Sequence, residues 1–165
     1  MIAILLRYLR YVHHHYLEDI ASHMDLAYAF VADAAQFTAD GKLWVLGGDF
    51  DTIYSPTYPV AQPVLTLVVK LFARPADCNR EHALLIDFAM PDGGAARLAT
   101  QSFTPQLRAD RPDLPAAVNL ALGFLGLTFS VPGAYTLRVV VDDAELAAVP
   151  LHLLQAEGPL RAPAS

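Results

Sequence analysis

Apolar residues recur at every second position along most of the chain after residue 25, and this period predicts β-strands. Residues 65–71 are the clearest case, with leucine or valine at each alternate position. Such a strand presents one apolar face to a core and one face to other surroundings. The same pattern recurs at 84–88 and 135–141. The chain is therefore expected to build sheets with a buried side.

Turn signals separate these apolar runs. Ala39–Lys42, Pro91–Gly94, Pro132–Gly133 and Asp142–Asp143 all combine residue types that favour tight turns. About eight short strands follow, spaced roughly 10–15 residues apart. The expected strands are 26–30, 43–46 with an extended piece at 50–54, 65–71, 84–88, 97–103, a bent or divided 118–129, 135–141 and 149–153.

This order predicts an all-β fold. Alternation with one apolar face indicates antiparallel sheets, and two such sheets packed face to face make a β-sandwich. The hairpin that begins at Pro132–Tyr135 is similar to the last strands of immunoglobulin-like domains, so we expect an immunoglobulin-like sandwich. A closed or half-closed barrel is the alternative.

The chain divides into a main domain and two short flanks. Residues 1–23 have apolar residues at helical spacing and include three adjacent histidines. They are read either as an N-terminal amphipathic helix or as a non-native extension, with Met24 as the true start. Residues 24–155 form the predicted sandwich, and 156–165 a frayed tail rich in proline and alanine.

Composition narrows the function. The formal net charge is −6 and the basic residues are scattered along the chain, so neither nucleic acid nor an anionic membrane is an expected partner. Cys78 is the single cysteine, which agrees with a reducing cytoplasm. No segment resembles a membrane span or a signal peptide. Nine arginines against two lysines suggest a bacterial source of high GC content.

Several local sequences carry a resemblance to a known family. The run Gly41–Ile53, the segment Asn79–His82, the Asp92–Gly93 turn and the run Pro132–Tyr135 resemble the DUF6941 family of uncharacterised bacterial proteins. The likeness extends from about Leu26 to Leu153 and leaves residues 1–23 outside. It implies a small β-rich cytoplasmic protein and brings no activity, cofactor or catalytic residue.

Two clusters are candidate binding sites. Asp49 and Asp51 follow a Gly-Gly bend and could present carboxylates to a ligand, although most ligands of a calcium loop are absent. Asn79 and His82 flank the start of a strand and could bind a polar ligand at one end of the sandwich. The competing interpretation of each cluster is structural, as a bend or a loop cap.

A loop and a tryptophan complete the candidates. Residues 104–115 form a proline-rich loop in which Arg108 and Arg111 could recognise a partner. Trp44 lies among apolar strand residues; it is expected to be buried in the core, and the alternative is that it anchors a partner. Cys78 has only His82 nearby as a base, and no Cys-His signature supports it as a nucleophile.

No motif for catalysis, a cofactor or a metal ion is recognised in the sequence. We therefore expect no enzyme, and instead a protein-binding or structural module that acts through loops, a sheet edge or self-association. A sandwich that binds a small ligand or carbohydrate, using the Asp49 and His82 clusters, is the first alternative. A hydrolase of unknown type is the second.

Overall fold

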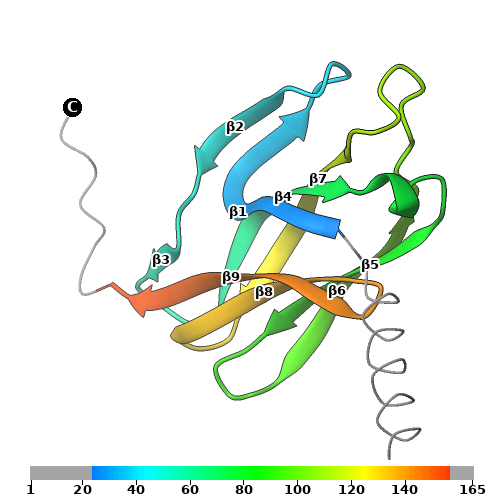
Figure 1. The fold of residues 1–165 in the computed structure, drawn as a ribbon. Coiled ribbons are helices and arrows are strands. Elements are labelled where there is room, and N and C mark those ends of the chain that lie inside the picture. Colours follow the sequence, from blue (N-terminus) through cyan, green and yellow to red (C-terminus); the bar gives the residue numbers. More distant parts are fainter. Residues whose placement is uncertain (1–23, 157–165) are drawn as a thin grey trace, which may run out of the picture.

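The computed structural model describes residues 24–156, and they form two β-sheets that pack face to face (Figure 1). Sheet A has four strands in the order β2-β1-β4-β7, and sheet B has five in the order β3-β9-β8-β5-β6. Every pairing is antiparallel except that of β3 with β9. The strands are β1 (Met24–Phe37), β2 (Leu43–Gly48), β3 (Thr52–Ser55), β4 (Val60–Ala73), β5 (His82–Ala89), β6 (Ala95–Phe103), β7 (Ala116–Phe129), β8 (Gly133–Val141) and β9 (Ala144–Gln155), and a short 3₁₀ turn, η1 (Pro75–Asp77), precedes β5.

The alternating residues of the sequence form the core between the sheets. The expected apolar side of β4 is wholly buried and belongs to the same core as the alternate apolar residues of β5 and β8. Tyr135 packs on Phe88 and Phe129 with ring centroids 5.1 Å apart in both cases. Its hydroxyl donates a hydrogen bond to the carbonyl of Val131 at 2.9 Å. The sequence pattern thus located the core-facing residues of β4, β5 and β8 correctly.

Sheet A is curled into a half-barrel. Strands β1 and β7 flank β4 on opposite sides, yet they also contact each other, so the sheet bends around β4. Thr66 and Val68 lie on the side of β4 that faces away from the core, and both are buried. The all-β, two-sheet prediction is confirmed. The immunoglobulin-like arrangement is not confirmed, because one sheet is curled into a half-barrel.

The predicted turns are present. Asp142 and Asp143 have φ angles of 47° and 68° and join β8 to β9, which suits residues that tolerate the left-handed region. Gly93 has a φ of 85° in the turn between β5 and β6. These turns set the register of the hairpins on both sides.

Several strands are longer than expected. β1 continues through an alanine-rich stretch to Phe37, where the apolar alternation is weak. β4 includes Pro63, a residue that we expected to lie outside the strand. β1 pairs with β4 only from Thr66 onward, so Pro63 lies where β4 has a neighbour on one side alone. Proline is tolerated at such an edge position. The interpretations of residues 1–23 and 157–165 fall outside the described residues.

Candidate functional site

Trp44 is the first correction to the sequence analysis. We expected a buried core tryptophan, but its side chain is 66% exposed. The residue lies on β2, at the edge of sheet A. Within residues 24–156, β2 has β1 as its one neighbour in the sheet, so it lies at the margin of the sandwich. The apolar run that predicted burial instead forms a surface.

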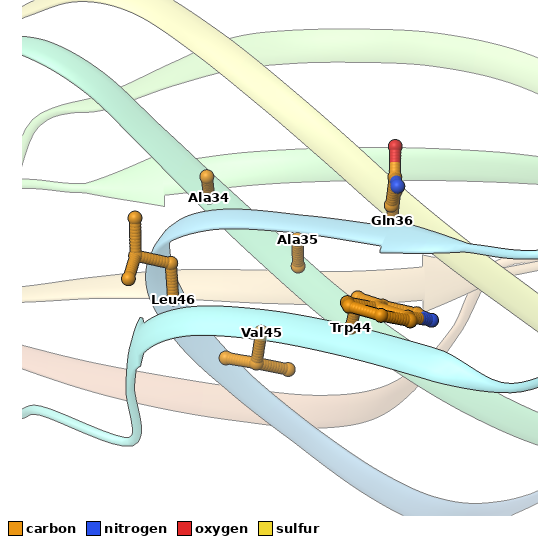
Figure 2. Close-up of a pocket in the computed structure, with 6 residues that line it drawn as sticks. All are labelled: Ala34, Ala35, Gln36, Trp44, Val45 and Leu46. Carbon is orange, nitrogen blue, oxygen red and sulfur yellow. The ribbon is translucent and has the colours of Figure 1, made fainter.

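Leu46 extends this apolar surface along β2, and Val45, between the two, adds an exposed apolar side chain on the opposite face of the strand (Figure 2). Leu46 is 70% exposed and Val45 is 42% exposed. In the register of the β1–β2 ladder, Trp44 lies opposite Gln36 and Leu46 opposite Ala34. Because Ala34 has a small side chain, the side chain of Leu46 projects beyond its cross-strand neighbour.

A cleft of about 360 Å³ is associated with this surface. Figure 2 shows the indole ring of Trp44 lying over the ladder between the two strands. The cleft has no charged side chain, and Gln36 is its one polar side chain. It is lined by Ala34, Ala35, Gln36, Trp44, Val45 and Leu46. Its chemistry therefore suits an apolar side chain.

The outer edge of β2 is unpaired within residues 24–156, because β2 has β1 as its one neighbour in the sheet. An edge strand leaves alternate backbone N–H and C=O groups free to pair with another chain. Proteins commonly protect such an edge with a charge or a proline. Leu43–Gly48 contains neither. The apolar side chains and the open edge thus belong to one strand.

Carboxylates surround the end of β2. Asp33 lies beside Gly47, and a Cβ atom placed on that glycine would collide with its Oδ2. Asp49 and Asp51 follow the strand and are exposed. No lysine or arginine of the described residues forms an ion pair with any of these three. This end of the edge is acidic.

Asp49 and Asp51 also have a structural role. Asp49 adopts a φ of 62°, and its N–H donates to the carbonyl of Val31 at 2.9 Å. The carbonyl of Asp51 accepts a hydrogen bond from the N–H of His152 at 2.6 Å. The segment carries the chain from sheet A to sheet B. No cluster of three or more potential metal ligands occurs among the residues that the structure describes.

The Asn79 and His82 cluster lies elsewhere, at the start of β5. Asn79 has a φ of 59°, donates its N–H to the carbonyl of Pro105 at 2.7 Å and accepts from the N–H of Leu107 at 3.2 Å. These bonds fasten the start of the 104–115 loop. The structure does not join this cluster with Asp49 and Asp51 into one site, and the geometry of Asn79 is that of a loop cap.

His82 is buried, and both ring nitrogens have partners. Nδ1 lies 2.6 Å from Oδ2 of Asp142, and Nε2 lies 2.7 Å from the carbonyl oxygen of Asp77. The ring also stacks on Phe103 with centroids 5.6 Å apart. A general base needs a free nitrogen that faces a nucleophile or water. The carbonyl of Asp77 occupies that position in His82.

Arg108 and Arg111 lie together in the 104–115 loop, as the sequence implied. Arg108 donates from Nε and Nη2 to the two carboxylate oxygens of Asp110, each at 3.0 Å. Arg111 approaches the same carboxylate at 3.6 Å. The hydrogen bonds from Arg108 lower the pKa of Asp110 below its ordinary value. The Asp110 carboxylate therefore forms ion pairs with both guanidinium groups.

A second cavity, of about 640 Å³, lies beside this loop. The tip of the β1–β2 hairpin, β4, β7 and the loop all contribute to its wall. Lys70 and Asn119, which are direct partners in the β4–β7 ladder, both line it. Sequence reasoning had named Arg108 alone among its lining residues. Lys70 and Asn119 gave no signal, because each is an isolated polar residue within an apolar run.

Comparison with known families gives one finding. The sequence model of a family described as "Family of unknown function (DUF6941)" matches residues 27–154. No curated protein matches the chain.

Solved structures give a distant likeness. One match is an alkylpurine DNA glycosylase, AlkC, from Pseudomonas fluorescens, bound to DNA that contains an abasic site analog. The sequence identity is 12% and the TM-score is 0.44. The match covers 81% of this chain but 31% of the glycosylase chain. A likeness at this level carries no argument about activity.

This match nevertheless contradicts our exclusion of nucleic-acid partners, and the exclusion is withdrawn. It rested on basic residues that are scattered along the sequence. Scatter in the sequence is not scatter in space: Lys70 and Arg108 are far apart in the chain, yet both line the larger cavity. Among the described residues, no helix is long and apolar enough to cross a membrane.

Proposed function

The chain belongs to the DUF6941 family, whose function is unknown, and from its geometry we propose a non-catalytic protein-binding module. In this proposal, an extended segment of a partner protein pairs with the open edge of β2 and so adds a strand to sheet A. Peptide recognition by strand addition draws affinity from backbone hydrogen bonds and specificity from side-chain pockets.

The observation that carries the proposal is the coincidence of an open edge with exposed large apolar residues. Trp44 and Leu46 are both about two-thirds exposed on a strand that has a free side. Tryptophan is enriched among the residues that dominate binding energy at interfaces. The cleft beside them holds about 360 Å³, enough for one apolar side chain of the added strand.

The charges near β2 define the partner further. Asp33, Asp49 and Asp51 make the end of the edge acidic, and the chain as a whole carries a charge of −6. A second copy of this chain would bring like charges to the interface, which is unfavourable. A partner segment that combines apolar residues with lysine or arginine would fit both the cleft and the acidic end.

The His82 geometry supports the non-catalytic part of the proposal. His82 is the only described histidine that pairs with a carboxylate, and its second ring nitrogen is hydrogen-bonded to the carbonyl oxygen of Asp77. Cys78 is buried, and its thiol lies against the carbonyl of Arg74 at 3.4 Å. The free, buried cysteine also agrees with our expectation that the protein works in the cytoplasm.

The test is a selection of random peptides on the full chain. We expect the enriched peptides to combine apolar and basic residues, and to protect the backbone amides of β2 from hydrogen exchange. Leu46→Lys should reduce peptide affinity at least tenfold, because it places a charge in the apolar cleft. Leu125→Lys is the matched control, since Leu125 is 81% exposed on β7, the other edge of sheet A.

Two results would overturn the proposal. The first is a selection in which no peptide distinguishes the natural chain from Leu46→Lys. The second is self-association that Leu46→Lys abolishes, which sedimentation velocity would detect. That outcome would make a second copy of the chain the occupant of the edge.

A further inference from the structure

The larger cavity is a separate feature with different chemistry from the β2 cleft. Its volume of about 640 Å³ lies within the range of small-molecule sites. Polar side chains from four segments reach it: Asp40 of the hairpin tip, Lys70 of β4, Asn119 of β7, and Gln106 and Arg108 of the loop. The β2 cleft, in contrast, has no charged side chain.

Lys70 supplies a positive charge to the cavity wall. Its Nζ lies 5.4 Å from the ring centroid of Phe72 and has no carboxylate within ion-pair distance among the described residues. The side chain is partly buried. A half-buried ammonium without a counter-charge is costly to leave unmatched, so a bound anion would stabilise it.

Asn119 supplies an unsatisfied acceptor next to Lys70. Its Oδ1 is buried and has no hydrogen-bond partner within residues 24–156. Buried polar atoms of this kind are few in folded proteins and each calls for a partner. Gly41 of the hairpin tip approaches the same amide, since a Cβ on that glycine would be 3.8 Å from Nδ2. A ligand donor, such as a hydroxyl group, would satisfy Oδ1.

The remaining wall fits the same kind of ligand. Arg108 brings a second cation, although its Nε and Nη2 donate hydrogen bonds to Asp110. Asp40 is matched by Lys42, whose Nζ lies 2.6 Å from Oδ2, so it does not cancel the charge of Lys70. Phe103 and Leu120 add apolar surface. The protein as a whole has a negative net charge, so the positive charge of the cavity wall is a local feature.

We infer that this cavity binds a small hydroxylated organic anion, with the anionic group against Lys70 and a hydroxyl donating to Oδ1 of Asn119. A carboxylate and a phosphate share the chemistry that Lys70 would recognise. The inference does not depend on the β2 edge, and it requires no peptide partner.

The chain is well suited to a direct test, because Lys42 and Lys70 are its two lysines. Reductive methylation with ¹³C-formaldehyde keeps their charge and gives one NMR signal for each, beside that of the terminal amine. The probes are sodium gluconate and glycerol 3-phosphate, with acetate, inorganic phosphate and glycerol as single-group references. We expect one of the two hydroxylated anions to shift the Lys70 signal saturably and to leave the Lys42 signal in place.

Variants of the full chain then assign the contacts by calorimetry on unmodified protein. Lys70→Gln and Asn119→Leu should each weaken the preferred anion at least tenfold, whereas Lys70→Arg should retain binding. Arg138→Gln removes one exposed positive charge on β8 and is the matched control. Leu46→Lys should leave anion binding unchanged, so this inference and the proposed function can fail separately.

The inference is overturned by the absence of saturable binding by both hydroxylated anions, by equal shifts of the two lysine signals, or by unchanged affinity in Lys70→Gln. Equal affinity for acetate or phosphate alone would also overturn it, because that result would leave no role for Asn119.

Discussion

Nδ1 of His82 lies 2.6 Å from Oδ2 of Asp142, although the two residues are separated by 60 positions in the sequence. The other oxygen of the same carboxylate accepts the N–H of Ala83 at 2.9 Å. Asp142 belongs to the β8–β9 turn, and its own N–H donates to the carbonyl of Ala83. One carboxylate therefore fastens a hairpin turn to the first residues of β5.

This relationship predicts a large stability effect for a residue in a turn. Asp142→Ala should lower the free energy of unfolding by about 1–3 kcal/mol, because it leaves the buried His82 ring and the Ala83 N–H without their acceptor. Asp142→Asn should cost less, because asparagine keeps one acceptor oxygen and tolerates a φ of 47°. Urea unfolding at neutral pH measures both values.

Asp143→Asn is the matched control for the turn. Asp143 also has a positive φ but is exposed, and no side-chain hydrogen bond involves it among the described residues. Its substitution should change the unfolding free energy by no more than about 0.5 kcal/mol. If Asp142→Ala destabilised the chain no more than Asp143→Asn does, the His82 contact would contribute nothing to folding.

The contact between His82 and Asp142 could not be predicted from the sequence, whereas the core could. Alternating apolar residues were sufficient to place the core of β4, β5 and β8, because burial on one face imposes a period of two. Nothing in the local sequence relates His82 to Asp142, since the contact follows from how β5 and β8 pair. The sequence could name His82 as a candidate but could not assign its partners.

Trp44 shows a different limit of prediction from the sequence. An apolar run predicts burial, but it does not say whether the strand is central or at an edge. β4 lies in the middle of sheet A and is buried on both faces over Leu65–Val69, whereas β2 lies at the margin. Strand order is a property of the whole sheet. The candidate surface on β2 therefore became visible only with the topology.

The exposure of Trp44 predicts a small stability cost for its removal. Trp44→Ala should change the unfolding free energy by less than about 1 kcal/mol, as expected of a surface substitution. Phe129→Ala, in the core, should cost about 3–5 kcal/mol because it leaves a cavity beside Tyr135. Thermal or urea unfolding of the two variants makes the comparison. A loss of several kcal/mol in Trp44→Ala would mean that the side chain is part of the core.

The contact between Gly47 and Asp33 predicts a coupled pair of substitutions. Gly47 has a φ of 57°, and an added Cβ would collide with the Asp33 carboxylate. Gly47→Ala should destabilise the chain by roughly 1–2 kcal/mol from the left-handed backbone alone, with a further cost for moving Asp33. Denaturant unfolding of both single variants and the double variant Asp33→Ala/Gly47→Ala measures the coupling.

In the double variant the collision is gone and the backbone strain remains. Its destabilisation should therefore be smaller than the sum of the two single effects, as is usual for residues in contact. Strict additivity would show that Asp33 does not lie beside Gly47, and it would remove one carboxylate from the acidic end of the β2 edge.

The bidentate contact between Arg108 and Asp110 predicts that the conformation of the 104–115 loop depends on pH. The hydrogen bonds from Arg108 are the main reason why the pKa of Asp110 is lowered from its ordinary value of 3.8, and Arg111 adds a smaller effect. A depressed carboxyl pKa stabilises the folded state above the unfolded pKa, and this contribution is lost as the pH falls through the folded pKa. The loop contact should therefore persist at neutral pH and open only in acid.

A ¹³C NMR titration of the Asp110 carboxyl group measures this directly. Arg108→Gln should raise the pKa of Asp110 back toward its ordinary value, whereas Arg111→Gln should move it much less, because Arg111 lies at 3.6 Å and forms no bidentate contact. Equal shifts in the two variants would mean that the bidentate geometry does not hold the loop. In that case Arg108 would be free to turn its whole guanidinium toward the neighbouring cavity, and its substitution should then weaken anion binding as much as that of Lys70.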